Sequence, residues 1–168
     1  MFNTISRMIR TGNLTEPRPA VAVTAHTVDT LQHALWQILG RALTIRHVDA
    51  GSCNGCELEI HALNNPYYNL EGAGIKFVAS PRHADLLLVT GPVAANMREA
   101  LLRSYDAIPD PKLVVAIGDC GKCGGIFGDT YATHGSISSI IPVDHTVEGC
   151  PPTPTAILAG ILQALAAC

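Results

Sequence analysis

Four short runs of apolar and β-branched residues, separated by segments with helical periodicity, constrain the fold of this chain most strongly. We predict strands at Leu43–Asp49, residues 75–79, Leu86–Thr90 and residues 112–117. The run Leu86–Thr90 is apolar almost throughout rather than alternating, which is typical of parallel strands that are buried on both faces. The sequence therefore predicts an α/β fold in which helices cover both faces of a parallel sheet.

Helical periodicity marks three segments that follow these strands. They cover residues 57–63, residues 94–105 and a C-terminal segment that starts at Thr153 and Pro154. Threonine is a favourable N-cap and proline is favoured in the first turn, so the start of the last helix is well marked. Its inward face is expected to carry Ile157, Leu158, Ile161, Leu162 and Leu165.

Length and composition limit the class of protein. The 168 residues are 48% hydrophobic, which suits one domain with one core and excludes a disordered or low-complexity chain. A net charge of −3 and an aromatic content of 5% exclude a charge-driven nucleic-acid binder. Charged residues make up only 15%, below the usual quarter or so, which favours an obligate subunit whose partners cover part of its surface.

The N-terminal part of the chain differs from the rest, and we divide the sequence into an arm (residues 1–26) and a domain (residues 27–168). The arm is either an amphipathic anchor for a membrane surface or partner groove, or a frayed basic terminus. A second helical pattern covers residues 27–43, with Trp36 beside its apolar stripe. The arm's apolar residues recur at helical spacing with arginines between them: Phe2, Ile5, Met8 and Ile9, with Arg7 and Arg10.

The compartment follows from what the sequence lacks. Its longest nearly apolar stretch, residues 156–168, is shorter than the roughly 20 residues that span a bilayer. The N-terminus has no apolar signal core and no twin arginine. We expect a peripheral protein on the cytoplasmic face of the cell membrane. Its six cysteines should then be reduced, which favours metal or redox chemistry over disulfides.

Five of the cysteines form a pattern that is typical of a metal site. Cys53 and Cys56 follow the first predicted strand, Cys120 and Cys123 follow the fourth, and Cys150 precedes two prolines. Because the carboxyl ends of parallel strands meet at one edge, we expect these thiols to share a site there. An iron–sulfur cluster, zinc and a dithiol redox pair all remain open, although the 63 residues between the pairs are more than a zinc ribbon usually has.

Three motifs in chain order carry a resemblance to a known family. They are Gly-Ser-Cys-Asn-Gly-Cys-Glu-Leu-Glu-Ile at residues 51–60, Gly-Asp-Cys-Gly at 118–121 leading into Gly-Gly-Ile-Phe-Gly at 124–128, and Gly-Cys-Pro-Pro-Thr-Pro at 149–154. Together they resemble the small, electron-transferring subunit of [NiFe] hydrogenases and its homologue, the 20 kDa subunit of respiratory complex I. The resemblance implies a flavodoxin-like domain that holds one [4Fe-4S] cluster beside a larger catalytic subunit.

The spacing of the first motif narrows this resemblance. Complex I subunits carry two adjacent cysteines there, whereas this chain has Cys53-x-x-Cys56, as hydrogenase small subunits do. The run most resembles the membrane-bound, energy-converting hydrogenases of the formate hydrogenlyase and CO-induced types. Their small subunits are short, face the cytosol and lack the C-terminal extension with two more clusters. By this resemblance the cluster ligands are Cys53, Cys56, Cys120 and Cys150.

The second cysteine pair departs from the family pattern. The family's third ligand matches Cys120, which directly follows a predicted strand. Cys123 lies further along what we expect to be a glycine-rich loop from residue 118, where it either competes as a ligand or is a spare thiol. We favour Cys120, because the position nearer the rigid strand is better defined. The terminal Cys168 is not expected to be a ligand.

Three further residues have both a structural and a functional interpretation. Glu59 either favours its helix N-terminus or, by resemblance, is an acid near the cluster coupled to proton movement, while Glu57 suits the helix dipole better. His47 either donates to a cluster sulfide or satisfies a core carbonyl. The glycine-rich segment 118–125 lacks the ending of a phosphate loop, so we expect no nucleotide or flavin site.

The leading hypothesis is an electron-transfer subunit of a membrane-bound [NiFe] hydrogenase. Its cluster would relay electrons between a ferredoxin-like subunit and the NiFe site of the large subunit, with membrane subunits as further partners. One alternative is a complex I-like or hydrogenase-related complex whose large subunit has lost nickel and reduces a quinone or another acceptor. A second alternative is a zinc-stabilised structural subunit without a redox role.

Overall fold

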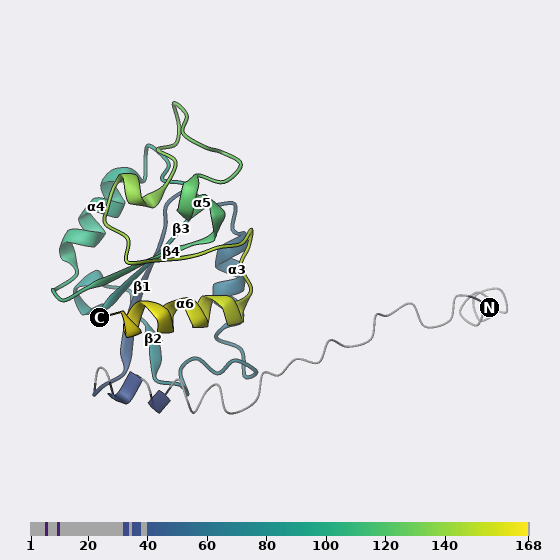
Figure 1. Cartoon of the computed structure of the whole chain (residues 1–168), viewed down its shortest axis with the longest axis vertical. Helices are drawn as coiled ribbons and strands as arrows, with labels where there is room; N and C mark the ends of the chain where they lie inside the picture. Colours follow the sequence, from purple (N-terminus) through teal and green to yellow (C-terminus); the bar gives the residue numbers. More distant parts are fainter. Residues whose placement is uncertain (1–5, 7–9, 11–31, 34, 38–39, 168) are drawn as a thin grey trace.

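The computed structural model describes residues 40–167, together with Ser6, Arg10 and residues 32–33 and 35–37 (Figure 1). Apart from Ser6 and Arg10, the arm lies outside the described residues, and so do residues 27–31, 34 and 38–39 of the helix predicted over residues 27–43. Five strands form one sheet: β1 (Leu43–Asp49), β2 (Ile75–Phe77), β3 (Leu86–Thr90), β4 (Leu113–Ile117) and β5 (His145–Val147). Within residues 40–167 the helices are α3 (Gly55–Ala62), α4 (Arg98–Ala107), α5 (Gly118–Cys123) and α6 (Pro154–Ala166), with 3₁₀ turns η1 (Pro81–His83) and η2 (Ile137–Ser139).

The sheet is entirely parallel and has the strand order β2-β1-β3-β4-β5. This is the order of flavodoxin-like folds, in which a ligand site forms outside the carboxyl ends of the strands. The central pairs are aligned over five residues, with Ile45 opposite Leu86 and Leu86 opposite Leu113. The predicted flavodoxin-like α/β class is therefore confirmed.

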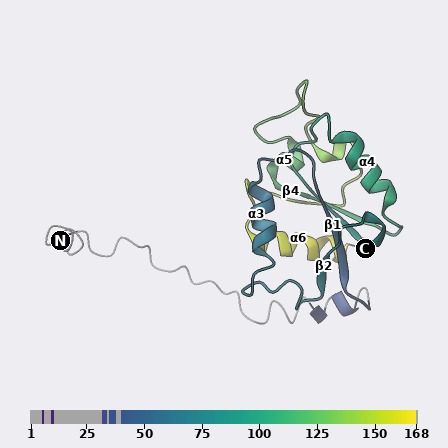
Figure 2. The ribbon, with the colours of Figure 1, turned by 180° about the vertical axis from the view of Figure 1, so that it is seen from behind.

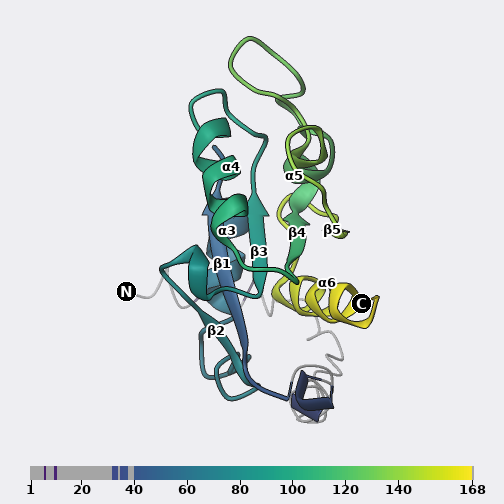
Figure 3. The ribbon, with the colours of Figure 1, turned by 90° about the vertical axis from the view of Figure 1, so that its left-hand side faces the viewer.

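Helices cover both faces of the sheet, as the continuous apolar strands predict. On one face α3 and α6 lie beside each other, and Ile60 and Ile157 pack in a core with Ile45 of β1 (Figure 2). On the other face Leu101 of α4 packs in a second core with Val89 of β3. Figure 3 shows α4 and α6 on opposite sides of the strands.

The last helix starts where the sequence predicts. Thr153 precedes α6 as its N-cap, and its side chain accepts a hydrogen bond from the backbone N–H of Ala156 at 3.3 Å. Of the five residues predicted to face inward, Ile157, Ile161 and Leu165 are buried, and the other two are partly buried against the same core. Among the described residues, no helix is both long and apolar enough to cross a membrane.

The structure corrects two of the predicted elements and adds a strand that was not predicted. The helix predicted from residue 94 begins at Arg98, because Ala94 instead pairs with Thr133 in an antiparallel bridge. The strand β5 escapes the sequence analysis because it has only three residues. The segment expected to be a glycine-rich loop after β4 is the short helix α5, so that prediction was wrong.

We expect Leu101→Ala to lower the free energy of unfolding by about 2–5 kcal/mol, because it leaves a cavity under α4. Leu101 is fully buried and is the only residue within α4 that is buried. The same truncation at its half-buried neighbour, Leu102→Ala, is the matched control and should cost clearly less. Urea denaturation measures both. Equal losses would mean that Leu101 does not anchor α4.

Candidate metal centre

Four cysteines lie in loops and helices that follow strands at one edge of the sheet. Cys53 follows β1 and Cys56 lies in the first turn of α3, while Cys120 lies on α5 directly after β4 and Cys150 follows β5. Cys56 and Cys120 are buried, whereas Cys53 and Cys150 are exposed. The site therefore has an inner pair and an outer pair of thiols.

These thiols are close enough to oppose one another's ionisation. The pKa of Cys56 is raised to about 12, first by burial and then by negative charge on Glu57, Cys120, Cys53 and Cys150, in that order. Burial also raises the pKa of Cys120, followed by the charges of Cys150 and Cys53. Four thiolates in one place need positive charge to compensate them, and metal ions supply it.

The backbone around the inner thiols leaves room for a group bound to their sulfur atoms. A Cβ at Gly118 would lie 2.8 Å from Sγ of Cys56, and a Cβ at Gly125 would lie 2.7 Å from Sγ of Cys120. Both positions have positive φ, which glycine adopts without strain. A set of four thiols suits an iron–sulfur cluster or zinc. In the part of the chain that the structure describes, no three His, Cys, Asp or Glu side chains are grouped closely enough to hold a single metal ion.

A network of hydrogen bonds fixes the loop that carries Cys53. Oδ1 of Asp49, the last residue of β1, accepts from the backbone N–H groups of Gly51 and Ser52, both at 2.8 Å. The hydroxyl of Ser52 donates to Oε2 of Glu57 at 2.5 Å and accepts from the N–H of Asn54 at 3.0 Å. The loop is thus tied both to its strand and to α3.

The two cysteines of α5 have different surroundings. Cys120 is buried beside Gly125, whereas Cys123 is exposed and its thiol donates to the backbone carbonyl of Asp119 at 3.3 Å within the same helix. A helix places residues three apart on one face but one turn further along its axis. This arrangement favours Cys120 as the residue that shares a site with Cys53, Cys56 and Cys150.

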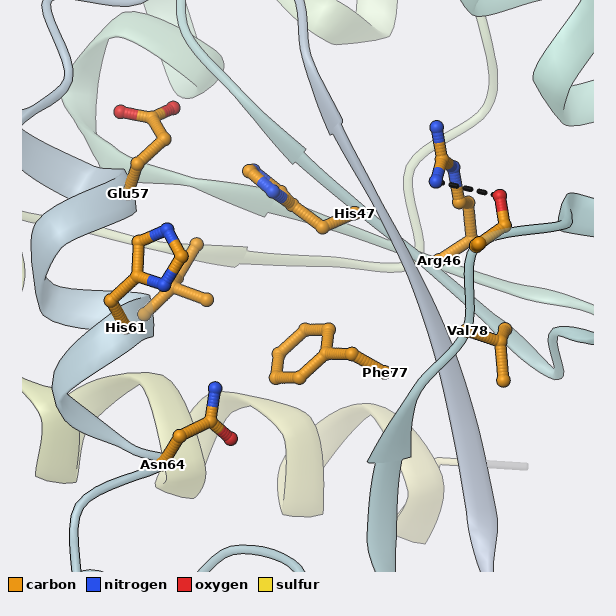
Figure 4. A pocket seen from close by; sticks show the side chains of 9 residues that line it. Arg46, His47, Glu57, His61, Asn64, Phe77 and Val78 are labelled. Atoms are coloured by element: carbon orange, nitrogen blue, oxygen red, sulfur yellow. Dashed lines mark hydrogen bonds between the residues drawn. The ribbon is translucent and has the colours of Figure 1, made fainter.

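A cavity of about 310 Å³ lies between β1, β2 and α3 (Figure 4). Its lining residues include His47, Glu57 and His61. Glu57 is only 6% exposed, and its Oε1 has no hydrogen-bond partner among the described residues; the same holds for Nε of Arg46. Buried polar atoms without protein partners are groups that water or a polar ligand could satisfy.

The cavity makes Glu57, rather than Glu59, the acidic residue with a position of interest. Glu59, the acid that the sequence analysis brings forward, is half-buried and does not line this cavity, whereas its neighbour Glu57 does. The sequence holds a signal that we missed: Glu57, Ile60 and His61 follow helical spacing on one side of α3, and Asn64 follows just after its end. His47 was expected to donate to a cluster sulfide or to satisfy a core carbonyl; its Nε2 instead lies 3.1 Å from the hydroxyl Oγ1 of Thr90.

Comparison with known proteins identifies the family. The family model of the 20 kDa subunit of NADH:ubiquinone oxidoreductase matches residues 53–164, which include all four of these cysteines. This chain belongs to the 20 kDa subunit family.

Members of the 20 kDa subunit family from hydrogenase complexes are among its similar relatives. The chain is 45% identical to formate hydrogenlyase subunit 7 of Escherichia coli over 91% of its own length and 62% of that protein, so it spans about three fifths of that relative. It is 49% identical to the probable membrane-bound hydrogenase subunit mbhJ of Pyrococcus furiosus, over 78% of each chain. An NADH-quinone oxidoreductase subunit of Herpetosiphon aurantiacus is 45% identical over 64% of this chain and 60% of that one. The resemblance stated from the motifs is confirmed.

Solved structures agree with this family. A chain of the membrane-bound sulfane sulfur reductase, an archaeal respiratory membrane complex, superposes with a TM-score of 0.67 at 34% identity, covering 81% of this chain and 74% of that one. A chain of the Dm. baculatum [NiFeSe]-hydrogenase has a TM-score of 0.58 at 18% identity, covering 75% and 63%. The second likeness concerns the fold alone.

We expect Gly118→Ala to reduce bound metal by about tenfold or more, because the added methyl group crowds Sγ of Cys56. The control is Gly74→Ala. Gly74 has nearly the same φ, 85° against 82°, but nothing lies within 4 Å of its Cβ position. Both variants should lose about 1–2 kcal/mol of stability from backbone strain, and only the first should lose metal. Elemental analysis measures the bound metal, and equal metal content in the two variants would contradict crowding of the Cys56 thiol as the cause.

We expect the stability of this protein to fall as the pH drops below about 7, in part because of His47. Burial lowers the pKa of His47 below its usual 6.5, so the folded protein keeps this ring neutral. Below that pH the unfolded chain binds the additional proton, which favours unfolding. His47→Gln should flatten the pH dependence of the urea midpoint. The exposed His83 provides the control, and an equal flattening by His83→Gln would contradict this assignment.

Proposed function

We propose that this chain is the electron-transferring subunit of a membrane-bound [NiFe] hydrogenase and holds one [4Fe-4S] cluster through Cys53, Cys56, Cys120 and Cys150. One observation carries the proposal: four thiols from three separate strand ends lie within reach of one another's charge at one edge of the sheet. Iron–sulfur clusters take four cysteine thiolates of this kind.

The arrangement of the four thiols suits a relay between proteins. When bound, a [4Fe-4S] cluster accepts and releases single electrons. Cys56 and Cys120 are buried and would fix the cluster to the domain. Cys53 and Cys150 are exposed, so their side of the site is open to a docked partner. Burial of two ligands also limits water around the cluster, which is one factor that sets its potential.

The partners we propose follow from the relatives. Formate hydrogenlyase subunit 7 and the probable membrane-bound hydrogenase subunit mbhJ are both named as parts of hydrogen-metabolising assemblies. We infer a large [NiFe] subunit that carries out the interconversion of H₂ with protons and electrons, a ferredoxin-like subunit and membrane subunits. This chain would lie peripherally on the cytoplasmic face of the membrane.

A second candidate function is a subunit of a related complex that acts on another electron acceptor, such as a quinone. Two findings favour it: the relative named as part of an NADH-quinone oxidoreductase and the structural likeness to the sulfane sulfur reductase complex. The first motif, with Cys53-x-x-Cys56, supports the hydrogenase interpretation.

The test is made on the complex purified without oxygen through a tag on this chain. We expect a brown complex whose broad visible absorption bleaches on reduction, with nickel in the co-purifying large subunit and H₂-dependent reduction of a viologen dye. A coloured complex without nickel, whose large subunit lacks two Cys-x-x-Cys motifs, would favour the second candidate. A colourless, zinc-loaded chain would overturn both.

The two cysteines of α5 allow a sharp test of the ligand set. We expect Cys120→Ser to lose the cluster or to leave a three-iron form, because its buried thiol would bind iron. Cys123→Ser should keep the EPR signal of the reduced cluster and most of the electron transfer, because its thiol is exposed and bonded within its own helix. Loss of the signal in Cys123→Ser but not in Cys120→Ser would reverse the assignment.

We expect the same result when any of the other three proposed ligands is replaced. Cys53→Ala, Cys56→Ala and Cys150→Ala should each lower iron and sulfide content and weaken association with the large subunit, because a bound cluster joins the loops that carry them. Unchanged iron and sulfide in all three would contradict the proposed site.

A further inference from the structure

Asp119 joins two of the cysteine-bearing segments through a reciprocal pair of hydrogen bonds. Its backbone N–H donates to the carbonyl of Gly149 at 2.9 Å, and its Oδ1 accepts from the N–H of Gly149 at 2.9 Å. Asp119 directly precedes Cys120, and Gly149 directly precedes Cys150. The two thiols are therefore each one residue away from a fixed backbone contact.

This contact lies where the sheet itself no longer holds the two segments together. The pairing of β4 with β5 ends at Ile117 and Val147. Beyond that point β4 turns into α5, and the chain after β5 has no further strand partner in the described structure. The Asp119 carboxylate accepts the N–H of Gly149, a bond that a backbone carbonyl of β4 would have made if the strand pairing had continued. An ion pair between Lys122 and Glu148 flanks the contact, but both side chains are largely exposed, so it contributes little.

We propose that Asp119 is a positioning residue that sets the distance between the Cys120 and Cys150 thiols for the group they hold. The proposal rests on the proposed function and extends it to a residue that is not itself a ligand. Cluster ligands must be held within about 0.5 Å of their working positions. A backbone clamp one residue from each ligand meets this requirement, whereas a flexible loop at Cys150 would not.

The chain contains a matched control for this clamp. Asp144 makes the same exchange at the opposite end of the same two strands: its N–H donates to the carbonyl of Val114 at 2.9 Å, and its Oδ2 accepts from the N–H of Val114 at 2.7 Å. In both cases the partners are 30 residues apart in sequence. The two clamps are alike in chemistry and in loop length, but only that of Asp119 adjoins cysteines.

The experiment compares Asp119→Ala, Asp119→Asn and Asp144→Ala in the complex purified without oxygen. The readouts are iron and sulfide content, the rate of iron loss to a chelator, the EPR signal of the reduced protein and its midpoint potential. We expect Asp119→Ala to lose iron about tenfold faster or more than the wild type, with an altered EPR line shape. Asp144→Ala should lose a similar amount of thermal stability and keep the wild-type rate and signal.

The asparagine variant separates geometry from charge. It retains an oxygen that can accept from Gly149, so iron should be retained, while the potential should rise because a negative charge near the site is gone. Asp119→Leu, which removes the acceptor but keeps the number and branching of the side chain's heavy atoms, replaces Asp119→Ala if that variant does not accumulate in the complex. We expect Asp119→Leu to lose iron at the same rate as Asp119→Ala.

Three results would overturn the inference. The first is an equal rate of iron loss in Asp119→Ala and the wild type, and the second is an equal acceleration in Asp119→Ala and Asp144→Ala. The third is loss of iron in Asp119→Asn to the same extent as in Asp119→Ala. A wild-type complex without iron and sulfide is a separate outcome, because it would overturn the proposed function first and this inference with it.

Discussion

Parallel alignment of the strands is the constraint on which the rest of this structure depends. Because β1, β4 and β5 point in the same direction, every segment that follows them starts at one edge of the sheet. Cysteines separated by as many as 97 positions, from Cys53 to Cys150, are brought to one edge of the sheet in this way. The apolar cores on the two faces hold the strands in this alignment, so the core determines where the thiols lie.

The thiols gathered at that edge oppose one another electrostatically. Burial and neighbouring negative charge raise the pKa of both Cys56 and Cys120, so the protein alone disfavours the thiolate form that a metal needs. Binding of a positively charged group reverses this balance, which couples metal binding to closure of the loops. The carboxylates of Asp49 and Asp119 fix the loops by accepting backbone N–H groups, and the charge of Asp119 also contributes to the raised pKa of Cys120.

The sequence determined the class of fold and the main candidates for the site. Continuous apolar runs such as Leu86–Thr90 specify strands that are buried on both faces, and Thr153 marks the start of α6 through a local N-cap. The cysteine motifs predict a four-thiol site and the family to which the chain belongs. These features are readable because each depends on residues that are close in sequence.

Only the tertiary structure decided the features that depend on distant partners. The three residues of β5 carry too weak a pattern to read, and they become a strand because β4 offers an edge for pairing. The glycine-rich residues after β4 form α5 although glycine disfavours helices, so packing against β4 and β5 overrides propensity there. In the same way Glu57 gains its buried position, and Asp119 its partner Gly149, from segments that the sequence does not show to be adjacent. Contacts between distant segments depend on how the whole chain packs, so they cannot be read from local sequence patterns.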